Sequence, residues 1–220
     1  MEPNEEGIVK TYHDTRLAFD PRREVLWRTL CEAYFQRLVP PDACVLDLGS
    51  GYGGFINSIR AGRRIAVDLW EEGPRFIDSA VEIKIGPVTD LEFLTDGSVD
   101  FVFASNLFEH LSQSDFGLTL TQLRRKLAPG GTLNILQPNY RFAYREYFDD
   151  YTHVSVYSDR SLADFLASQG FSVFENHPRF LPLTVASRFP VAPFLIRLYL
   201  ASPFKILGKQ MLLRATADPK

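Results

Sequence analysis

The sequence predicts an α/β fold whose mostly parallel sheet is covered by helices on both faces. Three observations lead to this prediction. Short apolar runs alternate with segments of helical periodicity along most of the chain. The runs are nearly continuous in Val, Ile, Leu and Phe, as is typical of strands buried on both faces. A length of 220 residues suits one domain with a sizeable core.

Local signals mark where the elements begin and end. The first helix starts at Asp20-Pro21, an N-cap followed by proline, and stops at Pro40-Pro41. A later helix stops at Pro129-Gly130-Gly131, and the last one runs from the N-cap Ser158 to Gly170 in the C′ position. The expected strands cover residues 44–48, 65–69, 81–85, 99–104, 132–136, 171–174 and 210–215.

Composition excludes several classes of protein. A net charge of −3 gives no global footprint for nucleic-acid binding, so no nucleic-acid partner is expected. Cys31 and Cys44 form neither a disulfide framework nor a metal pattern. Asp149, Asp150 and His153 share one short loop, which is a poor metal pattern, so no metal site is expected. The first residues carry no apolar stretch for a signal peptide, which favours a cytoplasmic location.

A glycine-rich turn, GSGYGG at residues 49–54, follows a buried strand and precedes an expected helix. Gly49, Gly51 and Gly54 also satisfy the dinucleotide pattern G-x-G-x-x-G, and Asp68 lies nineteen residues after Gly49, near the ~20 expected for an acid that binds ribose hydroxyls. The turn alone therefore leaves open two nucleotide cofactors and a purely structural role.

Asp47 separates these alternatives. It stands two residues before Gly49, at the end of a strand where an apolar residue would be ordinary. A carboxylate there would repel a pyrophosphate but can face an ammonium group or organise the loop amides. The charge pattern therefore favours a cationic nucleoside that carries an amino acid.

Five segments in the order VLDLGSGYG, AVDL, DGSVDFVFASNLFEHL, LRRKLAPGGTL and SLADFLASQGFSV resemble the class I S-adenosylmethionine-dependent methyltransferases. The resemblance runs from about Val45 to Val173. It implies a Rossmann-like three-layer α/β/α sandwich with a seven-stranded, mostly parallel sheet and an antiparallel last strand. It also implies S-adenosyl-L-methionine as the cofactor.

The resemblance implies cofactor-binding roles for nine residues. Asp68 could instead cap a helix, and Asn106 could be a turn residue. Family members often place an acid after the glycine that follows the third strand, but here Pro87 follows Gly86, which leaves Asp90 as the nearest acid. The nine residues are Asp47, Gly49, Ser50 and Gly51 for the methionine moiety, Asp68 for the ribose, Leu69 and the Val88 amide for the adenine, and Asn106 and Leu107 near the methionine end.

Methyl transfer from a sulfonium relies on positioning, and a base is needed only when the acceptor is a hydroxyl or a protonated amine. If a base exists, we expect His153 to serve, with His110 as the second candidate. A structural role for His110 and an ordinary solvated loop around His153 are the alternatives. His13 lies in a segment that could form a lid, and His177 resembles a turn residue.

The C-terminal part of the chain is basic and apolar. Residues 178–220 contain seven basic residues but only one acid, Asp218. The apolar region Phe189–Leu207 contains three prolines, which are too many for a helix that spans a membrane. Residues 178–208 could pack on the sheet edge, form a homodimer contact, or rest on the anionic inner face of a membrane. We expect residues 1–40 to form an N-terminal lid and helix, 41–177 the cofactor-binding core, and 178–220 this excursion with the last strand.

The favoured function is methyl transfer to an oxygen or nitrogen of a small-molecule or glycan- or lipid-linked acceptor; bacterial methyltransferases that resemble this chain often accompany the assembly of such glycans. Two alternatives remain: a nicotinamide-dependent Rossmann oxidoreductase, and a cofactor-binding protein without transfer activity.

Overall fold

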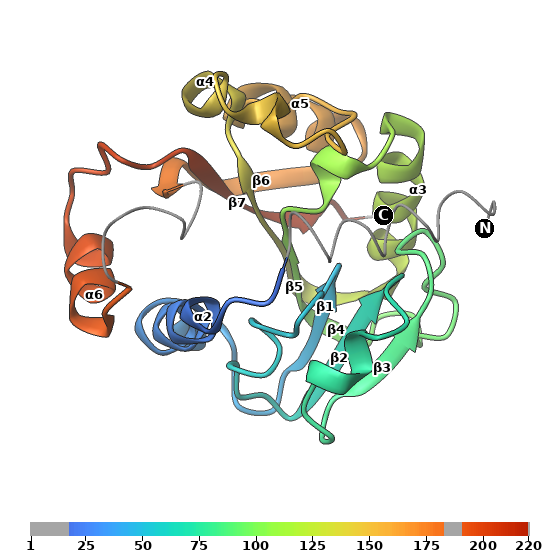
Figure 1. Cartoon of the computed structure of the whole chain (residues 1–220). Helices are drawn as coiled ribbons and strands as arrows, with labels where there is room; N and C mark the ends of the chain where they lie inside the picture. The colour runs from blue at the N-terminus through green and yellow to red at the C-terminus, as the bar shows by residue number, and fades with distance from the viewer. Residues whose placement is uncertain (1–17, 183–190, 220) are drawn as a thin grey trace.

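The computed structural model describes residues 18–182 and 191–219. Its centre is a seven-stranded sheet with the order β3-β2-β1-β4-β5-β7-β6 (Figure 1). All neighbouring strands from β3 to β5 pair in parallel, whereas β7 runs antiparallel to both β5 and β6. This topology confirms the expected fold class, including the antiparallel last strand.

In the described part of the chain, α-helices separate the strands from β4 onward as the sequence predicts, whereas the connections between β1 and β4 contain turns and one 3₁₀ helix but no α-helix. Short 3₁₀ helices η1 (Phe35–Leu38), η2 (Gly73–Phe76), η3 (Phe108–His110) and η4 (Tyr147–Asp149) lie in the connections. The strands are β1 (Cys44–Leu48), β2 (Arg63–Asp68), β3 (Glu82–Ile85), β4 (Val99–Ser105), β5 (Leu127–Pro138), β6 (Phe171–Leu181) and β7 (Gln210–Ala217). The α-helices are α2 (Pro21–Ala33), α3 (Gln113–Lys126), α4 (Tyr140–Ala143), α5 (Asp159–Ser168) and α6 (Pro193–Ala201).

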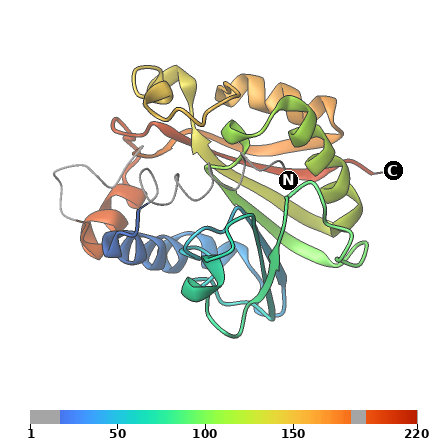
Figure 2. The same cartoon turned by 45° about the vertical axis from the view of Figure 1, so that its right-hand side comes forward.

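The sheet has a separate hydrophobic core on each face because successive strand residues point to opposite sides. In β4, Val102 joins the core beneath α3 and α5, and its neighbour Phe103 joins the core beneath α2. In β1, Leu46 and Val45 divide in the same way. Figure 2 shows α3 and α5 on one side of the sheet and α2 and α6 on the other. Asp47 lies two residues from Val45 and therefore belongs to the α2 face.

The predicted N-caps of two helices are confirmed, whereas Pro129-Gly130-Gly131, the predicted stop of a later helix, lies within β5 because α3 already ends at Lys126. Asp20 caps α2 by accepting a 2.9 Å hydrogen bond from the Arg22 amide. Ser158 caps α5, and Gly170 follows it with a φ of +78°. The first helix is shorter than expected, since α2 ends at Ala33 and continues as η1.

The expected helix after the glycine-rich turn is absent, and this part of the prediction was wrong. Residues 51–58 form a series of turns. Gly51 and Gly53 have φ values of +50° and +69°, which the right-handed α-helix does not accept. Only isolated i to i−4 hydrogen bonds form there, from the amides of Asn57 and Ile59.

The C-terminal excursion packs against the helical layer on the α2 face. Ile196, Tyr199 and Leu200 of α6 pack against that core, and Arg197 pairs with Glu32 of α2 at 2.7 Å. The strand expected over residues 171–174 runs on to Leu181, so His177 lies within β6 and not in a turn. Among the described residues, no helix has the length and apolar character needed to cross a bilayer.

Candidate cofactor and active site

The strands β1, β2 and β4 are parallel and end at one edge of the sheet, where the residues expected to bind the cofactor gather. The Gly49 amide, just after β1, donates to the Val67 carbonyl of β2 at 2.9 Å. The Asn106 amide, just after β4, donates to the Leu136 carbonyl of β5 at 2.8 Å. These bonds hold the loops after the strands in fixed positions at this edge.

Asp68, the last residue of β2, ties the glycine-rich turn to its own loop. Its Oδ2 accepts from the Gly51 amide at 2.7 Å, and its Oδ1 accepts from the Trp70 amide at 2.9 Å. The residues after Asp68 form a bend and turns, so Asp68 does not cap a helix. Each carboxylate oxygen has a second lone pair, which can accept from a ribose hydroxyl.

Asp47 is a buried acid beside this turn, with an exposed fraction of 3%. Burial raises the pKa of its carboxyl well above the ordinary value, and the nearby Asp68 raises this pKa further, while a hydrogen bond from the Ile56 backbone lowers it. The neighbouring Ser50 Oγ is buried and has no hydrogen-bond partner within the described part of the chain. A cationic ligand with hydrogen-bonding groups would stabilise both side chains.

Gly49 and Gly54 of the turn are required for different structural reasons. Gly49 has a φ of +66°, and a Cβ there would lie 3.0 Å from Leu107 Cδ1, so Leu107 packs directly over its backbone. A Cβ on Gly54 would lie only 2.3 Å from Cδ1 of Trp27 in α2. Gly54 is therefore needed for helix packing, which explains why the turn also satisfies the dinucleotide pattern.

Asn106 is the single non-glycine residue with a left-handed backbone among those described, with a φ of +50°. Its Oδ1 accepts from Gln210 Nε2 at 2.9 Å, and its Nδ2 donates to Ser105 Oγ at 3.0 Å. Gln210 begins β7, and its contact with Asn106 could not be predicted because 104 residues separate the two.

Of the residues expected around the adenine, Leu69 directly precedes Trp70, a member of an aromatic cluster. Leu69 is half-buried directly after Asp68, whereas the Val88 side chain is buried in the core on the α3 face. Asp90 is exposed, and its Oδ1 accepts from the Glu92 amide. Rings of four further residues contact one another at centroid distances from 4.7 to 6.0 Å; these are Phe19, Tyr52, Trp70 and Phe76. Sequence reasoning missed this cluster because no local pattern connects its members.

The two candidate bases, His110 and His153, lie together, with ring centroids 4.8 Å apart. His110 Nδ1 is 2.9 Å from Thr152 Oγ1 and 3.3 Å from the Thr152 carbonyl, and His153 Nδ1 is 2.5 Å from the Tyr147 carbonyl. Because a carbonyl only accepts, Nδ1 carries the hydrogen in both rings, and the lone pair of each neutral ring is on Nε2. Burial and the neighbouring His153 lower the pKa of His110 to about 4.

A third ionisable residue, Glu109, completes this group. Its side chain is fully buried, both of its carboxyl oxygens lack hydrogen-bond partners within the described residues, and burial raises its pKa to about 8. One ligand atom each from Glu109, His110 and His153 lies within 4.8 Å of the others. The expectation of no metal site considered only the loop around His153, whereas Glu109 lies 44 residues earlier in the sequence.

The tyrosine-rich segment between β5 and α5 is not an irregular loop. It contains α4 and η4, and Tyr147 and Tyr157 are buried. Tyr147 Oη donates to the Ser155 carbonyl at 2.7 Å, which holds the stretch beside His153. Tyr144 and Tyr151 remain exposed at this surface. His13 lies outside the described residues.

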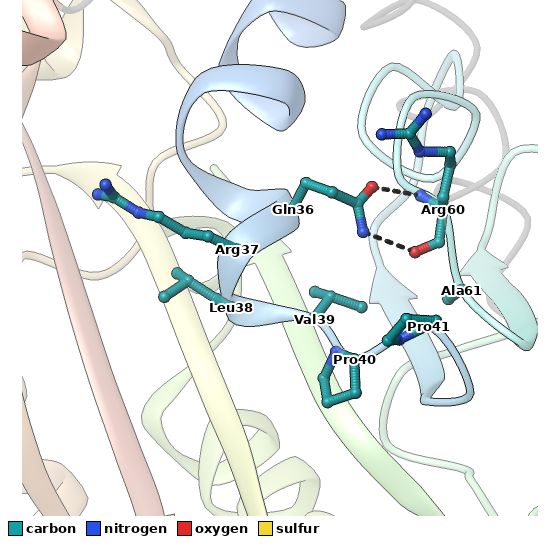
Figure 3. A pocket seen from close by; sticks show the side chains of 8 residues that line it. All are labelled: Gln36, Arg37, Leu38, Val39, Pro40, Pro41, Arg60 and Ala61. Carbon is teal, nitrogen blue, oxygen red and sulfur yellow. Dashed lines mark hydrogen bonds between the residues drawn. The ribbon is translucent and has the colours of Figure 1, made fainter.

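A depression of about 640 Å³ lies at the opposite edge of the sheet, before β1 and β2 begin (Figure 3). Gln36 crosses it, with its side-chain amide bonded to the backbone of Arg60 at 2.9 Å in both directions. It lies away from the loops after β1, β2 and β4, so it is not the proposed cofactor site. Its lining residues are Gln36, Arg37, Leu38, Val39, Pro40, Pro41, Arg60 and Ala61.

These features define a class of protein: the S-adenosylmethionine-dependent methyltransferases of class I, whose sheet carries an antiparallel seventh strand. A family model described as a methyltransferase domain matches residues 19–176, and the chain belongs to this family. Its cofactor is S-adenosyl-L-methionine, and membership excludes the nicotinamide alternative.

Individual relatives agree with this assignment. A malonyl-[acyl-carrier protein] O-methyltransferase from Methylococcus capsulatus is 31% identical over 157 residues, which cover 64% of this chain and 56% of that protein. This chain thus matches little more than half the length of that relative. A Haloferax volcanii complex of a methyltransferase with the Trm112 methyltransferase activator gives a TM-score of 0.68 at 21% identity and covers 98% of this chain and 97% of its own. An S-adenosylmethionine-dependent methyltransferase from Archaeoglobus fulgidus gives a TM-score of 0.64 at 21% identity, with 94% and 98% covered. At this identity the structures show a shared fold.

Proposed function

We propose that this methyltransferase acts on an oxygen of a small-molecule or glycan- or lipid-linked acceptor, with nitrogen as the second acceptor class. The observation that carries the proposal is the pair of imidazoles, His110 and His153, held with their lone pairs on Nε2 beyond the end of β4. A hydroxyl acceptor must lose a proton during transfer, and a neutral imidazole can take it.

The cofactor side of the site follows from residues already described. Bound S-adenosyl-L-methionine supplies an electrophilic methyl group on a sulfonium. Asp47 and the amides of the glycine-rich turn would bind its amino-acid end, and Asp68 would accept from the ribose hydroxyls. Asn106, fixed by Gln210, would border the methionine end and so position the methyl group.

An oxygen acceptor also agrees with the relative from Methylococcus capsulatus, whose name describes O-methylation of a malonyl group on acyl-carrier protein. That protein is longer than the region matched here, so its acceptor is not transferred to this chain. Only the class of acceptor atom enters the proposal.

Methyl transfer from labelled S-adenosyl-L-methionine to a panel of hydroxyl, carboxyl and amine acceptors tests the proposal. We expect label on an oxygen acceptor, and we expect His153→Ala and His110→Ala to lower turnover while leaving cofactor affinity within about twofold, because neither ring belongs to the proposed cofactor cradle. Near-parental turnover in both variants would show that neither histidine is the base.

We further propose that the end of the C-terminal excursion rests on a membrane surface that carries the acceptor. Phe204, Ile206 and Leu207 are 75%, 73% and 57% exposed and flank Lys205. Phe194 and Leu198 of α6 are also exposed by about two thirds. Apolar side chains with an interspersed cation suit an anionic lipid surface.

A further inference from the structure

We propose that Glu109, His110 and His153 form a binding site for a divalent transition-metal cation such as Zn²⁺, Mn²⁺ or Co²⁺. The three ligand atoms come from η3 and from the loop after η4 and lie within 4.8 Å of one another. Two imidazoles and one carboxylate form a ligand set that leaves further coordination positions open to an acceptor.

The strongest reason for a ligand here is Glu109. Its side chain is fully buried, and neither carboxyl oxygen has a hydrogen-bond partner in the described part of the chain. A buried carboxyl without partners is costly to maintain, and a coordinated cation satisfies both oxygens. Within the described residues, no lysine, arginine or histidine side chain forms a salt bridge with Glu109.

The histidines are oriented as metal ligands usually are. Metal-binding imidazoles commonly donate the hydrogen of their other nitrogen to a carbonyl or a carboxylate-linked group, which fixes the ring and its tautomer. His153 Nδ1 donates to the Tyr147 carbonyl, and His110 Nδ1 donates to Thr152, whose Oγ1 in turn donates to Asp150 at 2.5 Å. In both rings the lone pair therefore lies on Nε2, the nitrogen that would coordinate a metal.

The backbone holds the two parts of the site together without a metal. The amides of Val154 and Ser155 donate to the Glu109 carbonyl at 2.9 and 3.0 Å, and Ser155 Oγ donates to the Leu111 carbonyl at 2.6 Å. Ligands bound at about 2.1 Å in tetrahedral geometry lie about 3.4 Å apart, so the group needs to contract by about 1.4 Å at its widest. Side-chain rotation can supply such a movement.

A bound cation would change how the acceptor hydroxyl loses its proton. Without the metal the two imidazoles would act as the bases proposed above. With the metal bound their lone pairs would be coordinated, and the cation would instead bind an acceptor oxygen and lower the pKa of its hydroxyl. This consequence rests on the proposed oxygen acceptor, whereas the metal site itself does not.

The test is titration of the chelator-treated full chain with CoCl₂ and ZnCl₂, followed by the visible spectrum of Co²⁺ and by calorimetry. We expect one ion per chain and a cobalt spectrum that differs from that of the hydrated ion. Glu109→Gln and His153→Ala should each weaken binding by at least about tenfold, because even outer ligand partners contribute that much.

His177→Ala is the matched control, since His177 also has a carboxylate neighbour, Glu175 at 2.5 Å, but lies outside the group. Its metal affinity should equal that of the parent chain. Binding of S-adenosyl-L-methionine by each variant verifies folding, and if Glu109→Gln fails this check, His153→Ala alone decides. No saturable binding, or equal binding in all variants, overturns the site. Because no acceptor is needed, metal binding without methyl transfer would instead count against the proposed function.

Discussion

Gln210 Nε2 donates a 2.9 Å hydrogen bond to Oδ1 of Asn106, so the first residue of β7 supports the strained turn after β4. A φ of +50° disfavours residues with a Cβ, and asparagine accepts it better than most. The bond therefore joins the last strand to the proposed methionine end of the cofactor site.

Replacing Gln210 with leucine should lower the affinity for S-adenosyl-L-methionine by about fivefold, because a net hydrogen bond contributes about 1 kcal/mol. Calorimetric titration measures this effect.

Asn106→Gly removes the hydrogen bond to Gln210 but relaxes the backbone, and Asn106→Ala removes the bond and keeps the strain. Denaturation should therefore find the alanine variant less stable than the glycine variant by about 1 kcal/mol. Equal stabilities would show that the turn is not strained.

Asp68→Asn should disturb the glycine-rich turn. The side-chain amide of asparagine has only one acceptor oxygen. The backbone N–H of either Gly51 or Trp70 would therefore lose its acceptor and meet an NH₂ group instead. We expect a loss of about 1–3 kcal/mol in the free energy of unfolding, with a cofactor affinity at least tenfold lower. Asp78→Asn is the control, because Asp78 also accepts from a backbone amide, that of Ala80, but is exposed. Equal effects of both changes would contradict a special role for Asp68.

Asp47 predicts a pH dependence. Burial raises its folded-state pKa above the unfolded value of about 3.9, so the folded state binds the proton more tightly. This contribution to the stability of the cofactor-free protein is present below that value and is lost as the pH rises. Urea denaturation at several pH values should show the decline. Asp47→Asn should make it smaller and leave the part that comes from Glu109, whose pKa burial raises to about 8.

The same acid should release a proton when the cofactor binds, because an ammonium group opposite the carboxyl lowers its pKa. Calorimetry in two buffers of different ionisation enthalpy measures this release at mildly acidic pH. For Asp47→Asn, the enthalpy of S-adenosyl-L-methionine binding should be the same in both buffers. A buffer-independent enthalpy in the parent chain would contradict the proposed contact.

Gly54→Ala should destabilise the protein by about 1–3 kcal/mol, because the new Cβ would overlap the Trp27 ring. Gly117→Ala is the matched control. Gly117 lies inside α3, where a Cβ would make only an ordinary 3.5 Å contact, so this change should stabilise the helix by up to about 1 kcal/mol. Thermal denaturation compares the two, and a neutral Gly54→Ala would show that Trp27 can move aside.

Membrane contact depends on the exposed apolar side chains near Lys205. The double change Phe204→Ser and Ile206→Ser should reduce co-sedimentation with anionic vesicles at least tenfold, since each buried apolar side chain contributes about 1.5–3 kcal/mol. Leu118→Ser, which removes a 54% exposed leucine from α3 on the other face, should leave binding unchanged. Absence of pelleting by the parent chain would end this proposal.

Much of the fold could be predicted because its signals are local. Buried strands such as 44–48 and caps such as Asp20 and Ser158 depend on neighbouring residues only. The turns after Gly51 were mistaken for a helix because their glycine backbone angles override the helical pattern. The hydrogen bond of Gln210 to Asn106 and the proximity of Glu109 to His153 could not be predicted. The strand order brings the first pair together, and backbone hydrogen bonds from Val154 and Ser155 to Glu109 bring the second pair together.

The reversed direction of β7 has a consequence for the diversification of this scaffold. Since β7 runs against the other strands, the chain between β6 and β7 leaves and re-enters the sheet at the rim that holds the cofactor loops. Its end is fastened there: the Lys209 amide donates to Leu181, and the Lys209 carbonyl accepts from Asn139, both at 2.8 Å. The end of this connection is thus anchored to the sheet beside the cofactor loops, and we expect changes in its described part, residues 191–208, to alter acceptor choice while the strands that hold the cofactor loops stay in place.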